Sequence, residues 1–140
     1  MCKLNSIGAE LSKLDSVKAM TDVTGFSLIG HLSEMCEGSN LSADIDFNKV
    51  PKIDVLQEYI DQNSMPGGTF TNWKSYSHGV SLAKEEYKSI LCDPQTSGGL
   101  LIAVSPDGVD EVEAILKENN LYNPSFGKLI KKGENLIAVK

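Results

Sequence analysis

Residues 19–31 read AMTDVTGFSLIGH, and the rest of the chain can be organised around them. They begin as a short segment of mixed apolar and polar residues, turn at Asp22 and continue into a helical pattern. Apolar side chains then recur every three or four residues, which predicts a helix with one face on a core; they are Leu28, Ile29, Leu32, Met35 and Cys36. Thr24 is a candidate N-cap, and Gly38 with Ser39 and Asn40 is expected to end the helix.

Asp22 lies just ahead of this expected helix start, where free backbone N–H groups and the helix dipole favour an anion such as phosphate. A carboxylate repels phosphate unless a divalent cation bridges the two. Gly25 and Gly30 suggest close approach by a ligand or another backbone, because a glycine inside a helix costs about 1 kcal/mol relative to alanine. The residues alone favour a simpler interpretation, in which Asp22 or Thr24 caps a helix and the glycines permit tight packing.

The composition is that of an ordinary soluble globular domain. The 140 residues are enough for one domain with a core, and 41% are hydrophobic and 23% charged. No apolar run approaches the ~20 residues of a membrane span, and no signal peptide is expected. The net charge of −6 argues against nucleic acid as a partner. Three widely spaced cysteines favour a reducing cytoplasm; they are Cys2, Cys36 and Cys92.

The order of the expected elements predicts an α+β fold with a mixed β-sheet layered with helices, in one domain spanning residues 1–140. The expected segments are a helix over 5–17, a strand over 41–47, a helix after Pro51 ending near 63, a loop over 64–79, a short helix over 83–91, an irregular segment over 92–99, an interior strand over 100–104 covered on both faces, a helix after Pro106, and a hairpin within 126–139. Asp44 and Asp46 are expected on a solvated strand face. His31 is expected to pack or form hydrogen bonds, and His78 to lie in a loop.

Two stretches resemble one enzyme family. Residues 19–31, together with CDPQTSGGLL at 92–101, are similar to the C-terminal domain of selenophosphate synthetase (selenide, water dikinase). PGGT at 66–69, followed by Asn72, matches a third part of that pattern in the expected place between the other two. The resemblance covers nearly the whole chain. The family belongs to a wider group built like aminoimidazole ribonucleotide synthetase, which implies an α+β C-terminal domain of a longer, two-domain enzyme.

The resemblance implies ATP-dependent conversion of selenide to selenophosphate, with AMP and orthophosphate as the other products. In the family, Mg²⁺ bridges the nucleotide phosphates to aspartates, and the one supplied by the C-terminal domain matches Asp22. Thr24 and Gly25 then lie in the phosphate neighbourhood. The resemblance also implies a cytoplasmic homodimer that uses ATP and selenide, without nucleic acid or membrane partners. It reverses the preference above, so Asp22 is predicted to be a metal ligand.

The chain also departs from the family pattern. The reactive cysteine or selenocysteine, its neighbouring lysine and a glycine-rich segment belong to the family's N-terminal domain, and none occurs here. No catalytic nucleophile is therefore expected in this chain, which resembles half of an enzyme and is predicted to be inactive alone. Cys2 lacks the surroundings of that nucleophile. Ser27 replaces the glycine usual in the pattern, and Asp93 and Thr96 are expected to shape a loop.

Two alternatives remain open at this stage. One is a domain of a related ATP-using synthetase of the same fold, such as an enzyme of purine synthesis. The other is a non-catalytic module that binds a nucleotide or a partner domain. The run QTSGG at 95–99 favours the selenium enzyme, because it belongs to that family's pattern.

Overall fold

The structure, a computed structural model, describes residues 3–140, so Cys2 lies outside the described residues. The helices are α1 (Gly8–Leu11), α2 (Ser27–Ser39), α3 (Leu56–Asp61), α4 (Gly67–Tyr76), α5 (Lys88–Leu91) and α6 (Val109–Glu118). The strands are β1 (Val17–Asp22), β2 (Leu41–Ile45), β3 (Val80–Leu82), β4 (Leu100–Val104), β5 (Gly127–Lys131) and β6 (Ile137–Val139). The predicted α+β class is confirmed. Within residues 3–140, no helix has the length and apolar character needed to cross a membrane.

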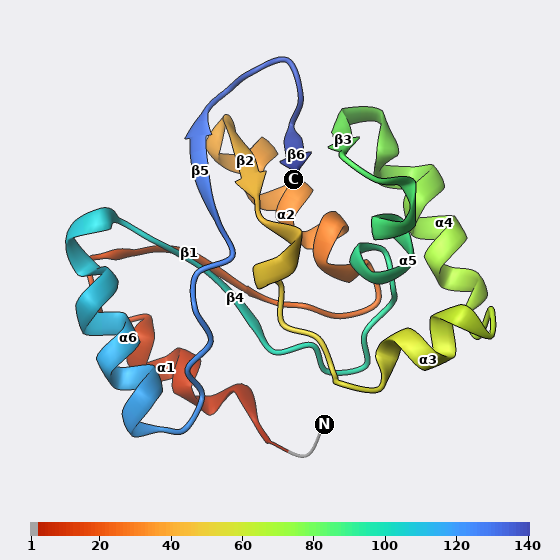
Figure 1. Ribbon diagram of the computed structural model, residues 1–140. Coiled ribbons are helices and arrows are strands. Elements are labelled where there is room, and N and C mark those ends of the chain that lie inside the picture. Colours follow the sequence, from red (N-terminus) through yellow and green to blue (C-terminus); the bar gives the residue numbers. More distant parts are fainter. Residues whose placement is uncertain (1–2) are drawn as a thin grey trace.

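The strands form two separate sheets (Figure 1). β1 and β4 make an antiparallel pair in which Asp22 stands opposite Leu100. The other sheet is mixed, with the order β3-β6-β2-β5. In it β2 runs antiparallel to β5 and parallel to β6, and β6 runs parallel to β3. Figure 1 shows α3, α4 and α5 on one side of the molecule and α1 and α6 on the other.

The main core lies where α2 packs against β2, α4, α5 and β1. Its fully buried members include Ile29 and Cys36 from the predicted face of α2, Ile45 from β2, Leu91 from α5 and Ile137 from β6. The periodicity that predicted the α2 face is therefore confirmed. The strand predicted over residues 41–47 is confirmed as β2 but ends at Ile45. Ala43 and Ile45 are buried, while Asp44 on the other face is half-buried and forms an ion pair with Lys140 at 2.8 Å.

The hairpin predicted within residues 126–139 is wrong, because β2 lies between the two strands. Every residue of β5 except Leu129 is exposed, so this strand occupies the edge of the sheet. In β6, by contrast, Ile137 and Val139 are buried. An apolar strand is stabilised by neighbours on both sides, whereas a charged strand protects a sheet edge. Burial therefore separates two strands that are adjacent in the sequence.

The interior strand predicted over residues 100–104 is also wrong in its placement. Strand β4 exists there, but it pairs only with β1, and Leu101 is its one buried residue. A continuous apolar run was expected to be covered on both faces. Here a two-stranded sheet leaves the remaining side chains half-buried.

The start of α2 differs from the expected one, whereas its end does not. Thr24 is not an N-cap: its hydroxyl lies 3.2 Å from His31 Nε2, and its backbone carbonyl accepts a hydrogen bond from the Ser27 N–H. Ser27 has a φ of +67°, the left-handed conformation in which glycine is favoured. The stop predicted at Gly38 with Ser39 and Asn40 is confirmed. Helix α2 ends at Ser39, and Asn40 follows as the C-cap, with a φ of +55° that makes the left-handed turn.

The helix predicted over residues 5–17 is much shorter, because Val17 begins β1 opposite Val104. Only a 3₁₀ turn over Asn5–Ile7 and α1 are helical. The loop predicted over residues 64–79 is wrong, since α4 begins directly after Pro66. The Pro-Gly-Gly sequence concealed a helical spacing that buries Thr69 and Asn72.

The remaining helices are found close to their expected places. Helix α3 lies in the segment after Pro51 but has no buried residue, and Ile53 ahead of it is 68% exposed. Helix α5 buries Leu91, and the 3₁₀ turn ahead of it buries Tyr87. The helix expected over residues 83–91 is shorter, and Ala83 ahead of it is exposed. Helix α6 follows a 3₁₀ turn that Pro106 begins. Strand β3 was not predicted.

Candidate functional site

Three segments that are distant in the sequence meet at one end of the β1–β4 pair. They are residues 22–26, here called the aspartate turn, residues 92–99, here called the glycine loop, and helix α4. The Val23 N–H donates to the Gly99 carbonyl at 2.9 Å, and the Val23 carbonyl accepts from the Gly98 N–H at 2.9 Å. These two bonds extend the β1–β4 pairing, so the aspartate turn and the glycine loop leave the sheet together.

Asp22, the predicted metal ligand, is the last residue of β1 and is exposed. Thr24 and Gly25 lie in the aspartate turn between Asp22 and Ser27, the first residue of α2. A Cβ built on Gly25 would meet nothing within 4 Å, so this part of the turn faces open space. The structure thus places Asp22 at a strand end, with Thr24 and Gly25 separating it from the helix.

The described residues offer one donor group for a divalent cation at the aspartate turn. Within residues 3–140, no group of three or more histidine, cysteine, aspartate or glutamate side chains is arranged to hold a metal. Mg²⁺ is usually held by one or two carboxylates together with water and substrate phosphates. Asp22 therefore fits as one ligand of an ion that other groups must complete.

Helix α4 braces both segments. The side chain of Asn72 donates from Nδ2 to the Gly25 carbonyl at 2.9 Å and to the Cys92 carbonyl at 3.1 Å. One turn earlier, the Thr69 hydroxyl lies 3.5 Å from Asp93 Oδ1. The third motif of the sequence is thus brought into contact with the other two.

Asp93 takes part in the internal bonding of the glycine loop. Burial raises the pKa of its carboxyl above the ordinary value, and hydrogen bonds from Gln95 and Thr69 partly offset this effect. Gln95 Nε2 donates to Asp93 Oδ2 at 2.7 Å, and the Gln95 N–H donates to the Thr24 carbonyl at 3.1 Å. These contacts support the predicted loop-shaping role of Asp93. Thr96 is exposed, and its role stays a prediction.

His31 is buried on α2, as predicted for a packing residue. Its Nε2 lies 3.2 Å from the Thr24 hydroxyl, and its Nδ1 lies 3.5 Å from Glu34 Oε2. The Phe26 ring is 5.8 Å from the imidazole, centre to centre. Gly30 permits this packing, because a Cβ there would lie 2.8 Å from Phe26 Cβ and 2.8 Å from a ring carbon of Tyr76. The predicted close approach at Gly30 is therefore made by side chains.

The cysteines within residues 3–140 are buried thiols. Cys36 and Cys92 are both 0% exposed. Burial raises the pKa of each thiol to about 11. Since the thiolate is the nucleophilic form, neither sulfur is suited to catalysis near neutral pH.

Alkylation tests whether these two thiols are inaccessible and protonated in the folded protein. With iodoacetamide at a pH of about 7.5, Cys36 and Cys92 should stay unmodified in the folded protein and react after unfolding in urea. Labelling should accelerate as the pH rises toward 11, because the buried thiols then ionise. The raised pKa also means that the free energy of unfolding should decrease as the pH rises from ~8.5, the pKa of an unfolded thiol, toward the pKa of the folded thiols. Peptide mapping by mass spectrometry gives the result, and rapid labelling of either folded thiol would contradict it.

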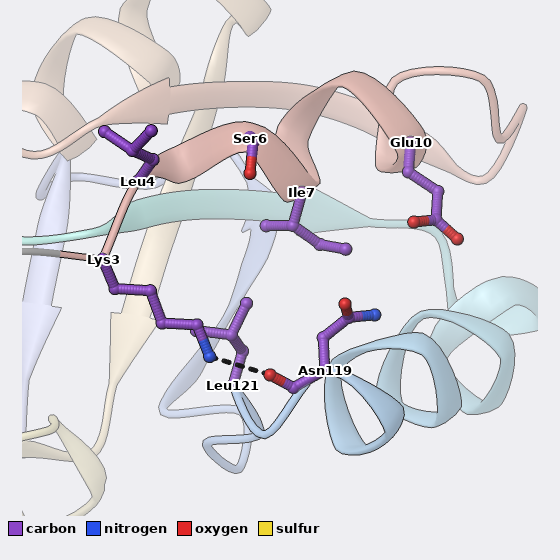
Figure 2. Close-up of a pocket in the computed structure, with 7 residues that line it drawn as sticks. All are labelled: Lys3, Leu4, Ser6, Ile7, Glu10, Asn119 and Leu121. Atoms are coloured by element: carbon purple, nitrogen blue, oxygen red, sulfur yellow. Dashed lines mark hydrogen bonds between the residues drawn. The ribbon is translucent and has the colours of Figure 1, made fainter.

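One surface groove, of about 440 Å³, lies away from these motifs (Figure 2). Residues preceding and within α1 form one wall, and residues following α6 form the other; they are Lys3, Leu4, Ser6, Ile7, Glu10, Asn119 and Leu121. The Lys3 ammonium donates to the Asn119 carbonyl at 2.8 Å, at the carboxyl end of α6. A cation there complements the negative end of the helix dipole. This lysine is therefore explained by helix capping, and none of the predicted site residues lines the groove.

The chain belongs to the family described as AIR synthase related protein, C-terminal domain, whose model matches residues 1–137. The fold class expected from the sequence and the resemblance to this wider group are thereby confirmed.

The similar curated proteins carry a more specific name. The chain is 51% identical over 140 residues to the selenide, water dikinase of Haemophilus influenzae (strain 86-028NP), with 100% of this chain and 40% of the relative covered. It is 46% identical over 139 residues to the selenide, water dikinase of Pseudomonas putida KT2440, covering 99% of this chain and 40% of that protein. For the Salmonella typhi protein of the same name the identity is 47%, with 100% and 41% covered. The chain thus spans about 40% of the length of these relatives.

Proposed function

We propose that this chain is the C-terminal domain of an ATP-dependent selenophosphate synthetase. The observation that carries the proposal is the identity of 46–51% to selenide, water dikinases over essentially the whole chain. The proposed reaction converts ATP, selenide and water into selenophosphate, AMP and phosphate. The family description also fits a related ATP-using synthetase, but the relatives at this level of identity favour the selenium enzyme.

In this proposal Asp22 is one ligand of a nucleotide-bound Mg²⁺. Its exposed carboxylate at the end of β1 is free of the ion pairs found among the described side chains. Magnesium, when bound, neutralises charge on the phosphates undergoing transfer. Thr24 and Gly25, in the exposed turn beside Asp22, form the neighbourhood of these phosphates. The bonds from Val23 to Gly98 and Gly99 hold the start of the turn in place.

The remaining parts of the machinery are proposed to lie outside this chain. An N-terminal domain supplies the cysteine or selenocysteine nucleophile and the other metal ligands, and the complete protein forms a homodimer in the cytoplasm. The short length relative to the selenide, water dikinases supports a second domain. The buried thiols of Cys36 and Cys92 support a nucleophile located in the N-terminal domain, since neither thiol is suited to nucleophilic attack.

The 140-residue chain is therefore expected to fold alone and to make no selenophosphate. Its buried core from α2, β2 and β6 supports cooperative folding, whereas a single carboxylate at the aspartate turn cannot assemble the reaction. Thermal melting by circular dichroism and an assay of selenide-dependent AMP formation test the two halves. The longer protein that contains these residues is the positive control. Selenide-dependent turnover by the chain alone would refute this division of labour.

A further inference from the structure

Asn72 occupies an unusual position between the aspartate turn and the glycine loop. It lies on α4 and is 7% exposed. Its side-chain amide donates to the carbonyl of Gly25, which is 47 residues away, and to that of Cys92, which is 20 residues away. A carboxamide nitrogen carries two protons, so each of these bonds uses one of them. Because both partners are carbonyl oxygens, the nitrogen is the only amide atom that can face them.

We propose that Asn72 is a positioning residue that locks the aspartate turn to the glycine loop and thereby holds Asp22 in place for the nucleotide-bound metal. The second half of this statement rests on the function proposed above. Three lines of geometry support the lock. Each loop places a backbone carbonyl against the same buried nitrogen, so neither can move away without leaving a donor and an acceptor unpaired.

The second line is the packing of α4 itself. A Cβ on Gly68 would lie 2.8 Å from Pro94 Cγ, so the helix lies directly against the glycine loop there. The Thr69 hydroxyl reaches Asp93 in the same loop. Helix α4 is thus fixed on the glycine loop at two positions besides Asn72. The bond from Asn72 to Gly25 is a hydrogen-bonded link from α4 to the aspartate turn, beside the edge-to-face contact of the Tyr76 and Phe26 rings, whose centres are 6.3 Å apart. Through its second bond, the same side chain connects this turn to the glycine loop.

The third line is the placement of the bonded carbonyl. Gly25 belongs to the exposed part of the aspartate turn, and a Cβ there would meet no atom within 4 Å. The turn is tied at its beginning by Val23 and Thr24, whose carbonyls accept from Gly98 and Gln95. Without Asn72, the Gly25 peptide loses its anchor to the interior. A ligand carboxylate positioned by a loosened turn binds its ion more weakly, because the turn must then be ordered on binding.

Asn72→Asp is the sharpest variant, because it keeps the shape, removes both donors and turns an oxygen toward two carbonyl oxygens. Asn123→Asp, in the exposed segment between α6 and β5, is the matched control for the added charge. In the 140-residue chain, amide hydrogen exchange by NMR should accelerate about tenfold or more at Gln95 and Gly98 in Asn72→Asp. The Lys140 amide, bonded to Ile45 in the main sheet, should exchange at its original rate. Uniform acceleration at all these amides would indicate general destabilisation and overturn the lock.

A measurement on the unaltered chain covers the case in which Asn72→Asp does not fold. The two side-chain amide protons of Asn72 should exchange at least about tenfold more slowly than those of Asn123, since both are bonded and buried. Equal rates would overturn the proposal.

The link to the metal is tested in the longer protein. Asn72→Asp should raise the Mg²⁺ concentration for half-maximal ATP turnover at least about threefold and leave the rate at saturating Mg²⁺ much less affected. If Asn72 only supported folding, the substitution would lower the ATP turnover rate by the same factor at every Mg²⁺ concentration without shifting this midpoint. An unshifted midpoint in an active Asn72→Asp enzyme overturns the positioning role. If the unaltered longer protein shows no selenide-dependent turnover, the proposed function fails, and the exchange measurements still decide whether the lock exists.

Discussion

Replacing Asp22 with asparagine is expected to abolish or severely reduce ATP turnover in the longer protein while leaving its melting temperature close to that of the unaltered protein. Mg²⁺ prefers charged carboxylate oxygens, and a carboxamide offers a neutral, weaker ligand. The substitution thus removes charge neutralisation where the transferring phosphates require it. Asp22 is exposed, and a purely structural cap would lose no more than ~1 kcal/mol. Turnover is measured by selenide-dependent AMP formation, and stability by thermal melting.

The control for this experiment is Asp15→Asn. Asp15 is also exposed and lies just before the opposite end of β1, so the variant makes the same chemical change away from the aspartate turn. It should retain near-normal turnover. In the 140-residue chain, Asp22→Asn should melt like the unaltered chain with or without Mg²⁺, because one carboxylate does not hold the ion tightly. Near-normal turnover by Asp22→Asn in the longer protein would return Asp22 to a structural role.

The parts of the fold that could be predicted are those with a local periodic signal. The spacing of Ile29, Leu32 and Cys36 on α2 repeats every three to four residues, and all three are buried. In strand β2 the apolar residues Ala43 and Ile45 of the alternating pattern are buried, although the polar Ser42 is buried too. Such patterns record which face of one element is buried. They do not record which strand lies beside which, and the separation of β5 from β6 by β2 followed from the burial of Ile137 and Val139.

Helix α4 shows a different limit. Its opening Pro-Gly-Gly favours a turn, and its buried face contains the polar residues Thr69 and Asn72. Because these side chains are bonded to the glycine loop and the aspartate turn, they occupy positions where a predictor expects apolar residues. The polar residues that connect α4 to the site therefore made its helical pattern hard to recognise in the sequence. Tertiary hydrogen bonds compensated for a weak local signal.

The candidate site was predictable as a set of segments but not as an arrangement. Asp22 could be singled out from the sequence because a carboxylate beside a turn and a helix start is an unusual combination. The two hydrogen bonds of the Asn72 side chain could not be foreseen, because their acceptors lie 47 and 20 residues away in the sequence. The left-handed conformation of Ser27 was likewise not indicated by the residue type, although the resemblance marks that position as one where glycine is usual.

Replacing Gly98 or Gly99 with valine is expected to lower the melting temperature of the 140-residue chain. The positive φ anticipated for this turn occurs at Gly99, where φ is +88° and a Cβ would meet no atom within 4 Å. Backbone strain is the cost there, about 1–3 kcal/mol. At Gly98 the cost is steric, because a Cβ would lie 2.9 Å from the Val23 carbonyl oxygen, to which the Gly98 N–H donates.

Each variant should lower the melting temperature by roughly 5–10 °C, in keeping with a loss of about 2 kcal/mol in a domain of this size. Gly133→Val is the matched control, because its Cβ would meet nothing within 4 Å and no positive φ is recorded there. In the longer protein, the Gly99 variant should keep most of its turnover per folded molecule although its melting temperature falls. The reason is that the backbone strain destabilises the folded state. Unchanged melting in both glycine-loop variants would show that the connection between the aspartate turn and β4 tolerates a side chain. The close approach of Gly98 to Val23 would then not restrict the backbone.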